Sequence, residues 1–273
     1  MGSFSSFYCS RKFWKTSKFT FRSSYTVGDH MKFLSLITLF LSLNIFALPT
    51  WTALEIEIKP GKYEQLQQGL DELMNSPVGK MYPGSVELNW HLNNGANPAT
   101  HAIVNLFPSM VASNEWGAVF WSPEATSIRE KWFDTLNDSA DVVRDMSFIQ
   151  IANWQPEENP QDYPYVEYVP MQTTDTRTVI EALNKFIATD DGKKFPGLVS
   201  MHQCNYCGES DTNSALIVQF KDVKDLESWY EITTTSDAFV DYLSDAREGT
   251  TFLGNSLVLV LSTWNNTPET FNQ

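Results

Sequence analysis

The 273-residue sequence predicts an α+β fold in which one unit, with the element order β-α-β-β-α-β, occurs twice. The first observation behind this prediction is a repeated peptide, because GKMYPGSV begins at Gly79 and GKKFPGLV begins at Gly192, 113 positions later. The second is that this offset aligns residues 79–116 with 192–229 without a gap and with nine identities in 38 positions. Such an internal repeat indicates two copies of one structural unit.

Each element of the first repeat has a local signal. Alternation of apolar and polar residues predicts strands at 54–59, 85–92, 101–107 and 147–154. Apolar residues at helical spacing predict a helix over 62–76 that ends at Pro77. A second helical stretch restarts at Ser122, which we expect to cap it, with Pro123 in the first helical position.

The second repeat shows the same order of signals. The predicted strands are 164–169, 197–204, 214–220 and 256–264, and the predicted helices are 175–188, 223–232 and 236–246. A polar, proline-rich linker at 155–163 separates the repeats. The expected domains are therefore 54–154 and 164–265, followed by a tail at 266–273.

A ferredoxin-like unit covers only one face of its four-stranded sheet with its own helices. The other face of each sheet needs a cover, and two fused units can supply it by packing these faces together. We therefore predict an intramolecular α/β barrel, with two independent domains on a linker as the alternative.

The N-terminal part of the chain has the pattern of a targeting segment. Residues 1–30 form a basic stretch without periodicity, and an apolar run follows from Phe33 to Leu48. This run is short for a spanning helix, which needs about 20 apolar residues. We interpret 31–53 as a secretory signal peptide, with Ala47 and Ala53 as candidate cleavage sites. The expected location is secreted or periplasmic.

Three points about this segment stay open. An uncleaved signal anchor would tie the protein to a membrane, and a bipartite organelle leader is a further alternative. The true start is either Met1 or Met31.

The charge balance argues against some partners. Removing residues 1–53 takes away six of the 19 basic and one of the 33 acidic residues, which leaves a net charge of −19. Such an acidic chain repels phosphate backbones, so we expect no nucleic acid among the partners.

The residues also show a resemblance to a known family. The stretch EIEIKPGKYEQLQQGLDEL, the peptide YPGSVELNW, the helix SNEWGAVF and the SPEA helix start resemble antibiotic-biosynthesis-monooxygenase-like domains of the dimeric α/β-barrel superfamily. The resemblance covers about residues 54–264 and is weaker in the second copy, where VPMQTTD replaces the Pro-Gly-Lys turn. It implies a barrel with an enclosed pocket. The superfamily includes cofactor-independent oxygenases, heme-degrading enzymes and members without a known reaction.

Strand alternation suggests which side chains face the barrel interior. On 85–92 we expect Val86, Leu88, Trp90 and Leu92 to pack under the helices, so that Glu87, Asn89 and His91 face inward. The same reasoning turns Glu55, Glu57, Glu167, Ser200, His202 and Cys204 inward. A histidine near a carboxylate can act as a general base, so the candidate catalytic residues are His91, His202 and Glu57. The alternative is that these polar residues face solvent.

Four tryptophans are candidate ligand contacts together with Asn89. Trp116 and Trp229 occupy matching positions in the two repeats, whereas Trp121 and Trp132 occur only in the first. Aromatic side chains of this kind either line an apolar pocket or fill the core between helices, and both interpretations stay open.

The motif HQCNYCG places Cys204 and Cys207 three residues apart. A zinc site normally needs four ligands, and no second Cys pair is present. In an oxidising compartment we expect a disulfide, with metal binding or redox cycling as alternatives. Cys9 lies outside the expected mature chain.

The sequence therefore predicts an exported protein with a small-molecule pocket, monomeric as a pseudo-dimer or homo-oligomeric, that takes an apolar or aromatic ligand. One hypothesis is a monooxygenase-like enzyme that needs no cofactor, and no metal site is expected. The alternatives are a non-catalytic binding or stress-related module and a heme protein, in which His91, His101 or His202 would be the axial ligand.

Overall fold

The computed structural model describes residues 48–155, 158–208 and 211–265. The basic leader, the signal segment up to Ala47, Cys9 and the C-terminal tail lie outside the described residues. All of these described residues belong to one compact unit.

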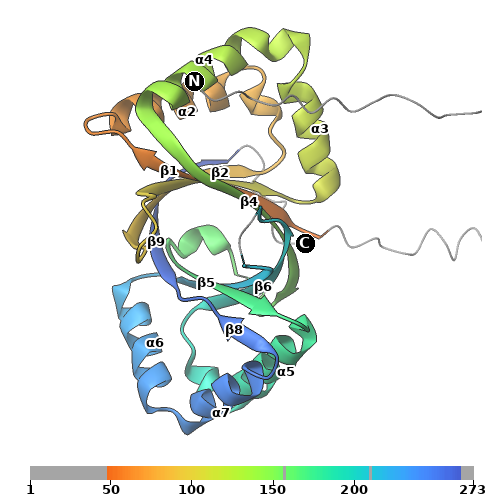
Figure 1. The fold of residues 1–273 in the computed structure, drawn as a ribbon, viewed down its shortest axis with the longest axis vertical. Helices are drawn as coiled ribbons and strands as arrows, with labels where there is room; N and C mark the ends of the chain where they lie inside the picture. The colour runs from red at the N-terminus through yellow and green to blue at the C-terminus, as the bar shows by residue number, and fades with distance from the viewer. Residues whose placement is uncertain (1–47, 156–157, 209–210, 266–273) are drawn as a thin grey trace, which may run out of the picture. The chain divides into compact units, whose positions relative to one another are not determined.

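The described part contains strands and helices in the alternating order shown in Figure 1. The strands are β1 (Thr50–Ile58), β2 (Ser85–Asn93), β3 (His101–Phe107), β4 (Ala140–Asn153), β5 (Tyr165–Thr173), β6 (Leu198–Tyr206), β7 (Ser214–Phe220), β8 (Thr250–Phe252) and β9 (Ser256–Asn265). The helices are α2 (Tyr63–Asn75), α3 (Met110–Phe120), α4 (Thr126–Ser139), α5 (Thr176–Ala188), α6 (Val223–Thr235) and α7 (Asp237–Ala246).

Eight strands form a closed antiparallel barrel. Neighbours around the ring follow the order β1-β3-β2-β9-β5-β7-β6-β4, and β4 pairs with β1 to close it. The pairs β2–β9 and β4–β6 join the two halves of the chain, and the short β8 adds to β5. The predicted barrel is therefore confirmed, and the alternative of two independent domains is wrong.

Helices cover the outside of the barrel in two layers. In Figure 1, α2, α3 and α4 lie over the strands of the first half, and α5, α6 and α7 lie over those of the second. Each layer has its own apolar core, one around Leu66 and Leu70 of α2 and the other around Val179 and Phe186 of α5. A third cluster, around Phe148, lies inside the barrel.

The glycines of the repeated peptide are explained by close contacts with backbone. A Cβ atom at Gly79 would lie 2.1 Å from the carbonyl oxygen of Leu73, and one at Gly84 would lie 2.0 Å from that of Leu106. Gly192 and Gly197 occupy the matching places in the second half and meet backbone oxygens at 2.0 and 2.3 Å. The repeat thus marks the turn where each first helix is followed by the next strand.

Besides the end of β5, which lies at Thr173 instead of residue 169, and smaller shifts elsewhere, the elements differ from the sequence prediction in three places. β1 begins at Thr50, four residues before the predicted start, and β4 begins at Ala140 instead of residue 147. The extension of β1 pairs with Ile149 to Met146 of β4, and the extension of β4 pairs with Ile58 to Ala53 of β1, so cross-strand pairing stabilises backbone that local alternation did not mark. The third difference is β8, which was not predicted.

Within the described residues, no helix is both long and apolar enough to cross a membrane.

Candidate functional site

Two cavities bring chemically active side chains together. The larger, here called the helix-side cavity, has a volume of about 380 Å³ and lies between the sheet and the helices of the second half. The smaller, here called the barrel cavity, has a volume of about 170 Å³ and lies inside the barrel. Their linings do not share a residue.

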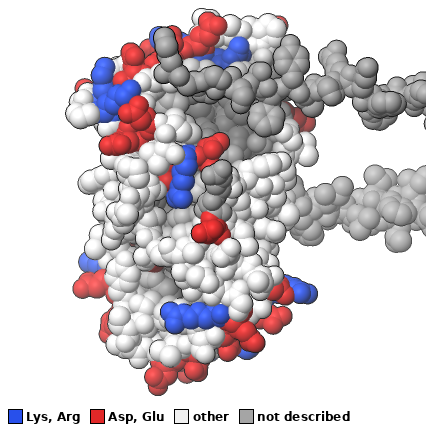
Figure 2. All heavy atoms as spheres, viewed as in Figure 1, with Lys and Arg blue, Asp and Glu red and all other residues white. Residues whose placement is uncertain are grey.

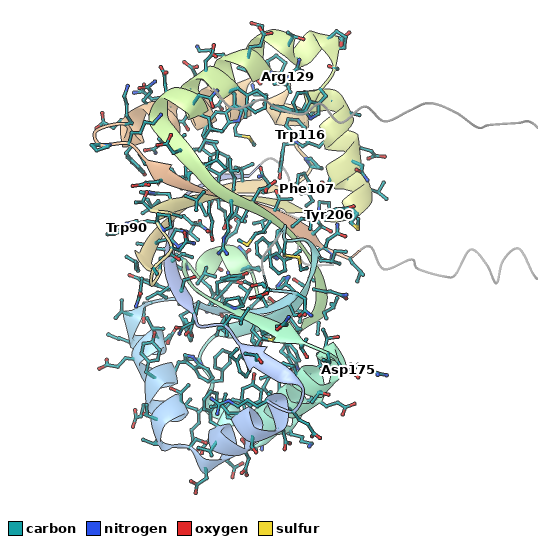
Figure 3. All side chains as sticks on the ribbon, in the orientation of Figure 1. Trp90, Phe107, Trp116, Arg129, Asp175 and Tyr206 are labelled. Atoms are coloured by element: carbon teal, nitrogen blue, oxygen red, sulfur yellow. A yellow bond between two sulfur atoms is a disulfide. The ribbon has the colours of Figure 1, made fainter. Side chains whose placement is uncertain are left out.

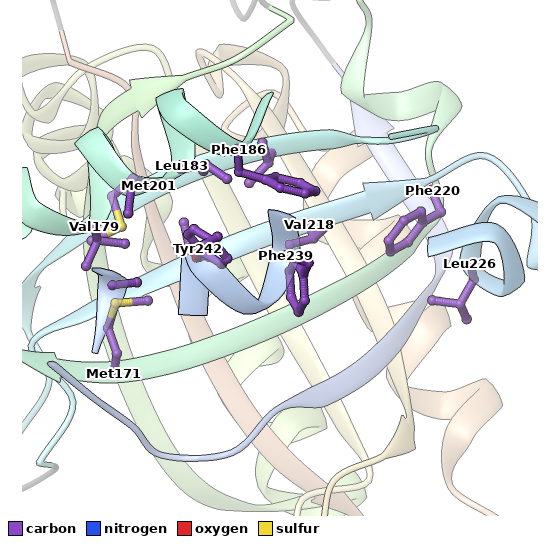
Figure 4. Close-up of a cluster of buried hydrophobic side chains, with 14 residues drawn as sticks. Met171, Val179, Leu183, Phe186, Met201, Val218, Phe220, Leu226, Phe239 and Tyr242 are labelled. Atoms are coloured by element: carbon purple, nitrogen blue, oxygen red, sulfur yellow. The ribbon is translucent and has the colours of Figure 1, made fainter. Parts of the chain in front are cut away.

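Aromatic and aliphatic side chains form most of the helix-side cavity. Its aromatic lining consists of Phe186, Phe195, Trp229, Tyr230, Phe239, Tyr242 and Phe252. Figure 4 shows Phe186, Phe239 and Tyr242 projecting from their helices toward Val218 of the sheet. The rings meet edge to face, as in the Trp229–Phe239 pair with centroids 5.2 Å apart. This lining is typical of a site for an apolar, flat molecule.

One buried carboxylate interrupts the apolar lining of the helix-side cavity, which also includes the side chains of Thr233, Arg247 and Asn255. Glu167 of β5 is 5% exposed, and one of its oxygens accepts a hydrogen bond from the indole N–H of Trp229 at 3.3 Å. Its other oxygen accepts a hydrogen bond from the side-chain amide of Asn255. A carboxylate offers about four acceptor positions, so Glu167 can accept a further donor from a ligand.

The matching space in the first half is filled. Trp116 contacts Tyr82 with centroids 5.1 Å apart and Phe120 at 5.8 Å, and Phe120 contacts Phe133 at 6.0 Å. The residue 113 positions after Phe120 is Thr233, which lines the helix-side cavity. A threonine in place of a phenylalanine is one reason why the second half has a cavity.

The barrel cavity is polar along one wall. Every second residue of β2 faces it, and these residues are Ser85, Glu87, Asn89 and His91. The Asn89 side chain forms a hydrogen bond with Glu87. β2 therefore presents a row of hydrogen-bonding groups to the interior.

Several of these polar atoms have no hydrogen-bond partner among the described residues. They are Ser85 Oγ, Asn89 Oδ1 and both ring nitrogens of His91, four of the six such buried atoms in the described part of the chain. Each unpaired buried polar atom costs about 1–3 kcal/mol, and whole domains are stable by only about 5–15 kcal/mol. The polar side chains of β2 that face the cavity are therefore expected to form hydrogen bonds with a molecule inside it.

His202, on the opposite wall, is fully engaged. Its Nδ1 accepts a hydrogen bond from the indole N–H of Trp51 at 2.9 Å, so the neutral ring carries its proton on Nε2 and donates to Ser200 Oγ at 2.7 Å. Burial lowers the pKa of His202 to about 3, so the ring is neutral near pH 7. His202 has no free base and instead fixes the orientation of Ser200.

Aromatic rings and an ion pair complete the barrel interior. Trp51 stacks on Phe148 with centroids 4.5 Å apart, and Tyr168 meets Trp51 edge to face at 6.5 Å. Glu55 is held by Arg144 through two hydrogen bonds of 2.6 and 2.8 Å. This pairing neutralises Glu55, which leaves Glu87 as the carboxylate of the cavity without a cation.

Because Glu87 is buried, we expect the free energy of unfolding of the protein to depend on pH. Burial raises its pKa from 4.5 to about 7, so its neutral form stabilises the fold below pH 4.5 and this contribution is lost as the pH rises through 7. We expect Glu87→Gln to gain about 2 kcal/mol relative to the wild type between pH 4 and 8. Urea unfolding at both pH values measures this difference. Burial lowers the pKa of His101 to about 4, and this residue and His202 act in the opposite direction but equally in both proteins. A difference that stays constant with pH would contradict the assignment.

The structure places the predicted inward residues as follows. Glu55, Glu87, Asn89, His91, Ser200 and His202 line the barrel cavity. Val86 and Leu88 pack under the helices as expected, but Trp90 and Leu92 are 45% and 38% exposed, because β2 continues beyond the helix layer (Figure 3).

Two predicted carboxylates lie elsewhere. Glu57 is exposed and lines neither cavity, since it lies near the end of β1. Glu167 lies on the helix side of β5, opposite to the side expected, because Val166 and Tyr168 are the residues that face inward.

Of the four candidate tryptophans, one lines a cavity, two pack in the first-half core and one is exposed. Trp229 lines the helix-side cavity. Trp132 is buried in the first-half core, and Trp116 packs against the same core, as Figure 3 shows. Trp121 is 65% exposed, with the guanidinium of Arg129 5.0 Å from its ring centre. Trp116, Trp121 and Trp132 thus line neither cavity.

Cys204 and Cys207 are joined by a disulfide at the end of β6. Both pack against the cluster of Trp51 and Phe148 inside the barrel. Among the described residues, no group of three or more His, Cys, Asp or Glu side chains is arranged to hold a metal ion.

Sequence reasoning missed Trp51 and the role of Glu167. Trp51 was assigned to the signal segment, although TWTALEIEI alternates from Thr50 onward and could have extended the strand. For Glu167, the signal was the alternation of β5, where Tyr165, Val169 and the fully buried Met171 share its side of the strand.

Neither a family of known proteins nor a characterised protein matches the sequence. Solved structures match the fold. An anthrone oxidase-like protein is 11% identical, with 80% of this chain and 93% of that chain covered and a TM-score of 0.52. A Fusobacterium nucleatum protein with a provisional assignment as a monooxygenase is 13% identical, with coverages of 81% and 96% and a TM-score of 0.51. A heme-binding protein from Thermus thermophilus is 11% identical over 79% and 92%, with a TM-score of 0.46. The first two likenesses show a dimeric α/β-barrel type of fold.

The histidines do not fit heme. His91 and His202 face a cavity of about 170 Å³, below the roughly 300 Å³ at which pockets for drug-sized ligands begin, and a porphyrin is larger still. The helix-side cavity is larger, but its lining contains no His, Cys or Met. His101 lies outside both linings, where its Nδ1 is 3.0 Å from Thr100 Oγ1.

Proposed function

We propose that the protein binds a small aromatic molecule in the helix-side cavity and oxidises it with dioxygen, in the manner of a monooxygenase. The observation that carries this proposal is a cavity of about 380 Å³, lined by aromatic rings, in which Glu167 is buried with room for a further hydrogen bond. Its size falls within the range of pockets that enclose drug-sized ligands.

The lining defines the substrate class. A flat apolar body matches Phe186, Trp229 and Phe239, and a hydroxyl group on that body can donate to Glu167. Helices α6 and α7 carry six acidic residues and one lysine, and Figure 2 shows acidic side chains gathered at that end of the molecule. The expected substrate is therefore an uncharged phenol with one or more fused rings.

The chemistry follows from a carboxylate next to a phenol. Glu167 accepts the proton of the phenol, or of anthrone in its enol form, which makes the ring electron-rich. Where the ring also carries a CH₂ group, dioxygen converts it to a ketone with release of water: CH₂ + O₂ → C=O + H₂O. One oxygen atom enters the substrate and the other becomes water, so the substrate supplies all four electrons.

Filling the cavity tests the location of this activity. We expect Thr233→Phe to weaken binding of anthrone and 1-naphthol at least tenfold, because the ring occupies the space that Phe120 fills in the first half. Thr234→Phe is the matched control, since Thr234 is exposed one position along the same helix. Tryptophan fluorescence measures binding and an oxygen electrode measures turnover. Equal binding by both variants would overturn the location.

The same experiment distinguishes catalysis from plain binding. Oxygen uptake with anthrone that exceeds the uncatalysed rate supports the enzyme. Saturable binding without oxygen uptake would instead support the non-catalytic binding module.

Two further proposals concern the chain as a whole. We infer a tandem duplication, supported by the shared element order and by strand orders β4-β1-β3-β2 and β9-β5-β7-β6 in the two halves. We also infer an export signal that is cleaved after Ala47, because cleavage after Ala53 would remove Trp51, which is buried in the barrel. Mass spectrometry of the exported protein would identify the cleavage site.

A further inference from the structure

The barrel cavity carries features that the proposed oxidation does not use. Ser85 is 1% exposed and Asn89 is 5% exposed, and both have a side-chain oxygen facing the cavity without a partner among the described residues. Both ring nitrogens of His91 are also buried without a hydrogen-bond partner among the described residues. Buried polar side chains normally have a hydrogen-bond partner. Because Ser85, Asn89 and His91 all face the same cavity, we infer that one molecule in this cavity is their common partner.

The opposite wall offers a second polar contact. β6 lies four strands from β2 in either direction around the ring, so the two strands face each other across the barrel. Ser200 Oγ accepts a hydrogen bond from the Nε2–H of His202, which directs the hydroxyl hydrogen of Ser200 away from the histidine. Ser200 can therefore donate a hydrogen bond to a molecule that reaches across from β2.

Apolar side chains line the space between these two walls. Val104, Met146, Val166, Ile217 and Val258 belong to five other strands and face the cavity. A barrel of eight strands is just wide enough to hold one small ligand. A cavity of about 150 Å³ accommodates benzene, so about 170 Å³ matches a single substituted ring.

We propose that the barrel cavity is a second binding site, for an uncharged single-ring aromatic molecule with polar groups at opposite ends. One polar group contacts Asn89 and His91 on β2, and the other accepts the hydrogen bond of Ser200 on β6. Glu87 disfavours an anion in this space, because Arg144 is paired with Glu55. This site is independent of the oxidation proposed for the helix-side cavity.

Hydroquinone, titrated under argon to prevent its oxidation, is the probe that tests this proposal. Calorimetry gives its affinity, and ¹⁵N chemical shifts of the His91 ring report where it binds. We expect saturable binding with a shift of the His91 signals, and at least tenfold weaker binding of phenol, which lacks the second polar group. 4-Hydroxybenzoate, an anion, should not bind.

Variants locate the site. Ser200→Ala should reduce the affinity for hydroquinone to that for phenol and leave phenol binding unchanged. Asn89→Leu should weaken both at least tenfold, because it removes the side-chain amide on β2 that contacts a polar group of the bound molecule. Thr233→Phe should leave hydroquinone binding within twofold of the wild type.

Three outcomes would overturn the proposal. One is no saturable binding of hydroquinone, with unchanged His91 signals, which would mean that water alone completes the polar row. Another is loss of hydroquinone binding in Thr233→Phe, which would place the molecule in the helix-side cavity. The third is equal affinity for hydroquinone and phenol in the wild type.

Discussion

Replacing Glu167 by glutamine is expected to lower the turnover of an oxidised phenol by about 10²–10⁴-fold, the usual contribution of a general base. Glutamine has nearly the same shape and retains one acceptor oxygen for Trp229 or Asn255, but it cannot take a proton. Substrate affinity should therefore change much less than turnover. Steady-state oxygen uptake, with kcat and KM measured separately, reads this difference.

The control for Glu167→Gln is the pH profile. An enzyme that depends on a carboxylate base should lose activity in acid, and the residual activity of the variant should not follow that profile. A variant with wild-type kcat would show that Glu167 only positions the substrate. A variant that fails to bind would show that its carboxylate holds the ligand.

A chain that begins at Leu54 is expected to be less stable than one that begins at Leu48, by about 3–5 kcal/mol from the loss of Trp51 alone. Trp51 is 9% exposed, stacks on Phe148 and donates a hydrogen bond to His202. The shorter chain also loses pairing on both edges of β1, because Thr50 to Ala53 pair with β3 and β4. Since domains are stable by about 5–15 kcal/mol, this is a large fraction of the total.

Urea unfolding of the two chains measures this loss. The matched variant is Trp51→Phe in the longer chain, which keeps a stacked ring on Phe148 but removes the hydrogen bond to His202. It should lie between the two chains in stability. Equal unfolding midpoints for the chains from Leu48 and Leu54 would show that the start of β1 adds nothing to the barrel.

Much of the fold could be predicted from local patterns. The strands at 101–107 and 214–220 match the structure residue for residue, because alternation and flanking turn residues define them locally. The first residues of β1 and β4 could not be found in this way. Their pairing partners lie about 90 positions away in the chain, and only the folded sheet of the first half brings the two strands together.

The candidate site could likewise be predicted only in part. Alternation correctly turned Asn89, His91 and His202 toward the barrel interior, because neighbouring side chains on a strand point to opposite faces. It could not show that Trp51 and Ser200 occupy both nitrogens of His202, since Trp51 lies 151 positions away. A histidine that looked like a free base in the sequence is therefore a positioning group in the structure.

The sequence by itself determined the repeated peptide, the order of most strands and helices and the glycines that allow backbone to approach backbone, because these depend on residues that are close along the chain. Only the tertiary structure decided which half keeps a cavity. Trp116 and Trp229 occupy matching positions and pack against the matching rings of Tyr82 and Phe195, yet Trp116 also contacts Phe120, whereas Trp229 lines a cavity beside Thr233. The space around a side chain is the sum of contributions from several distant elements, and no local pattern records that sum.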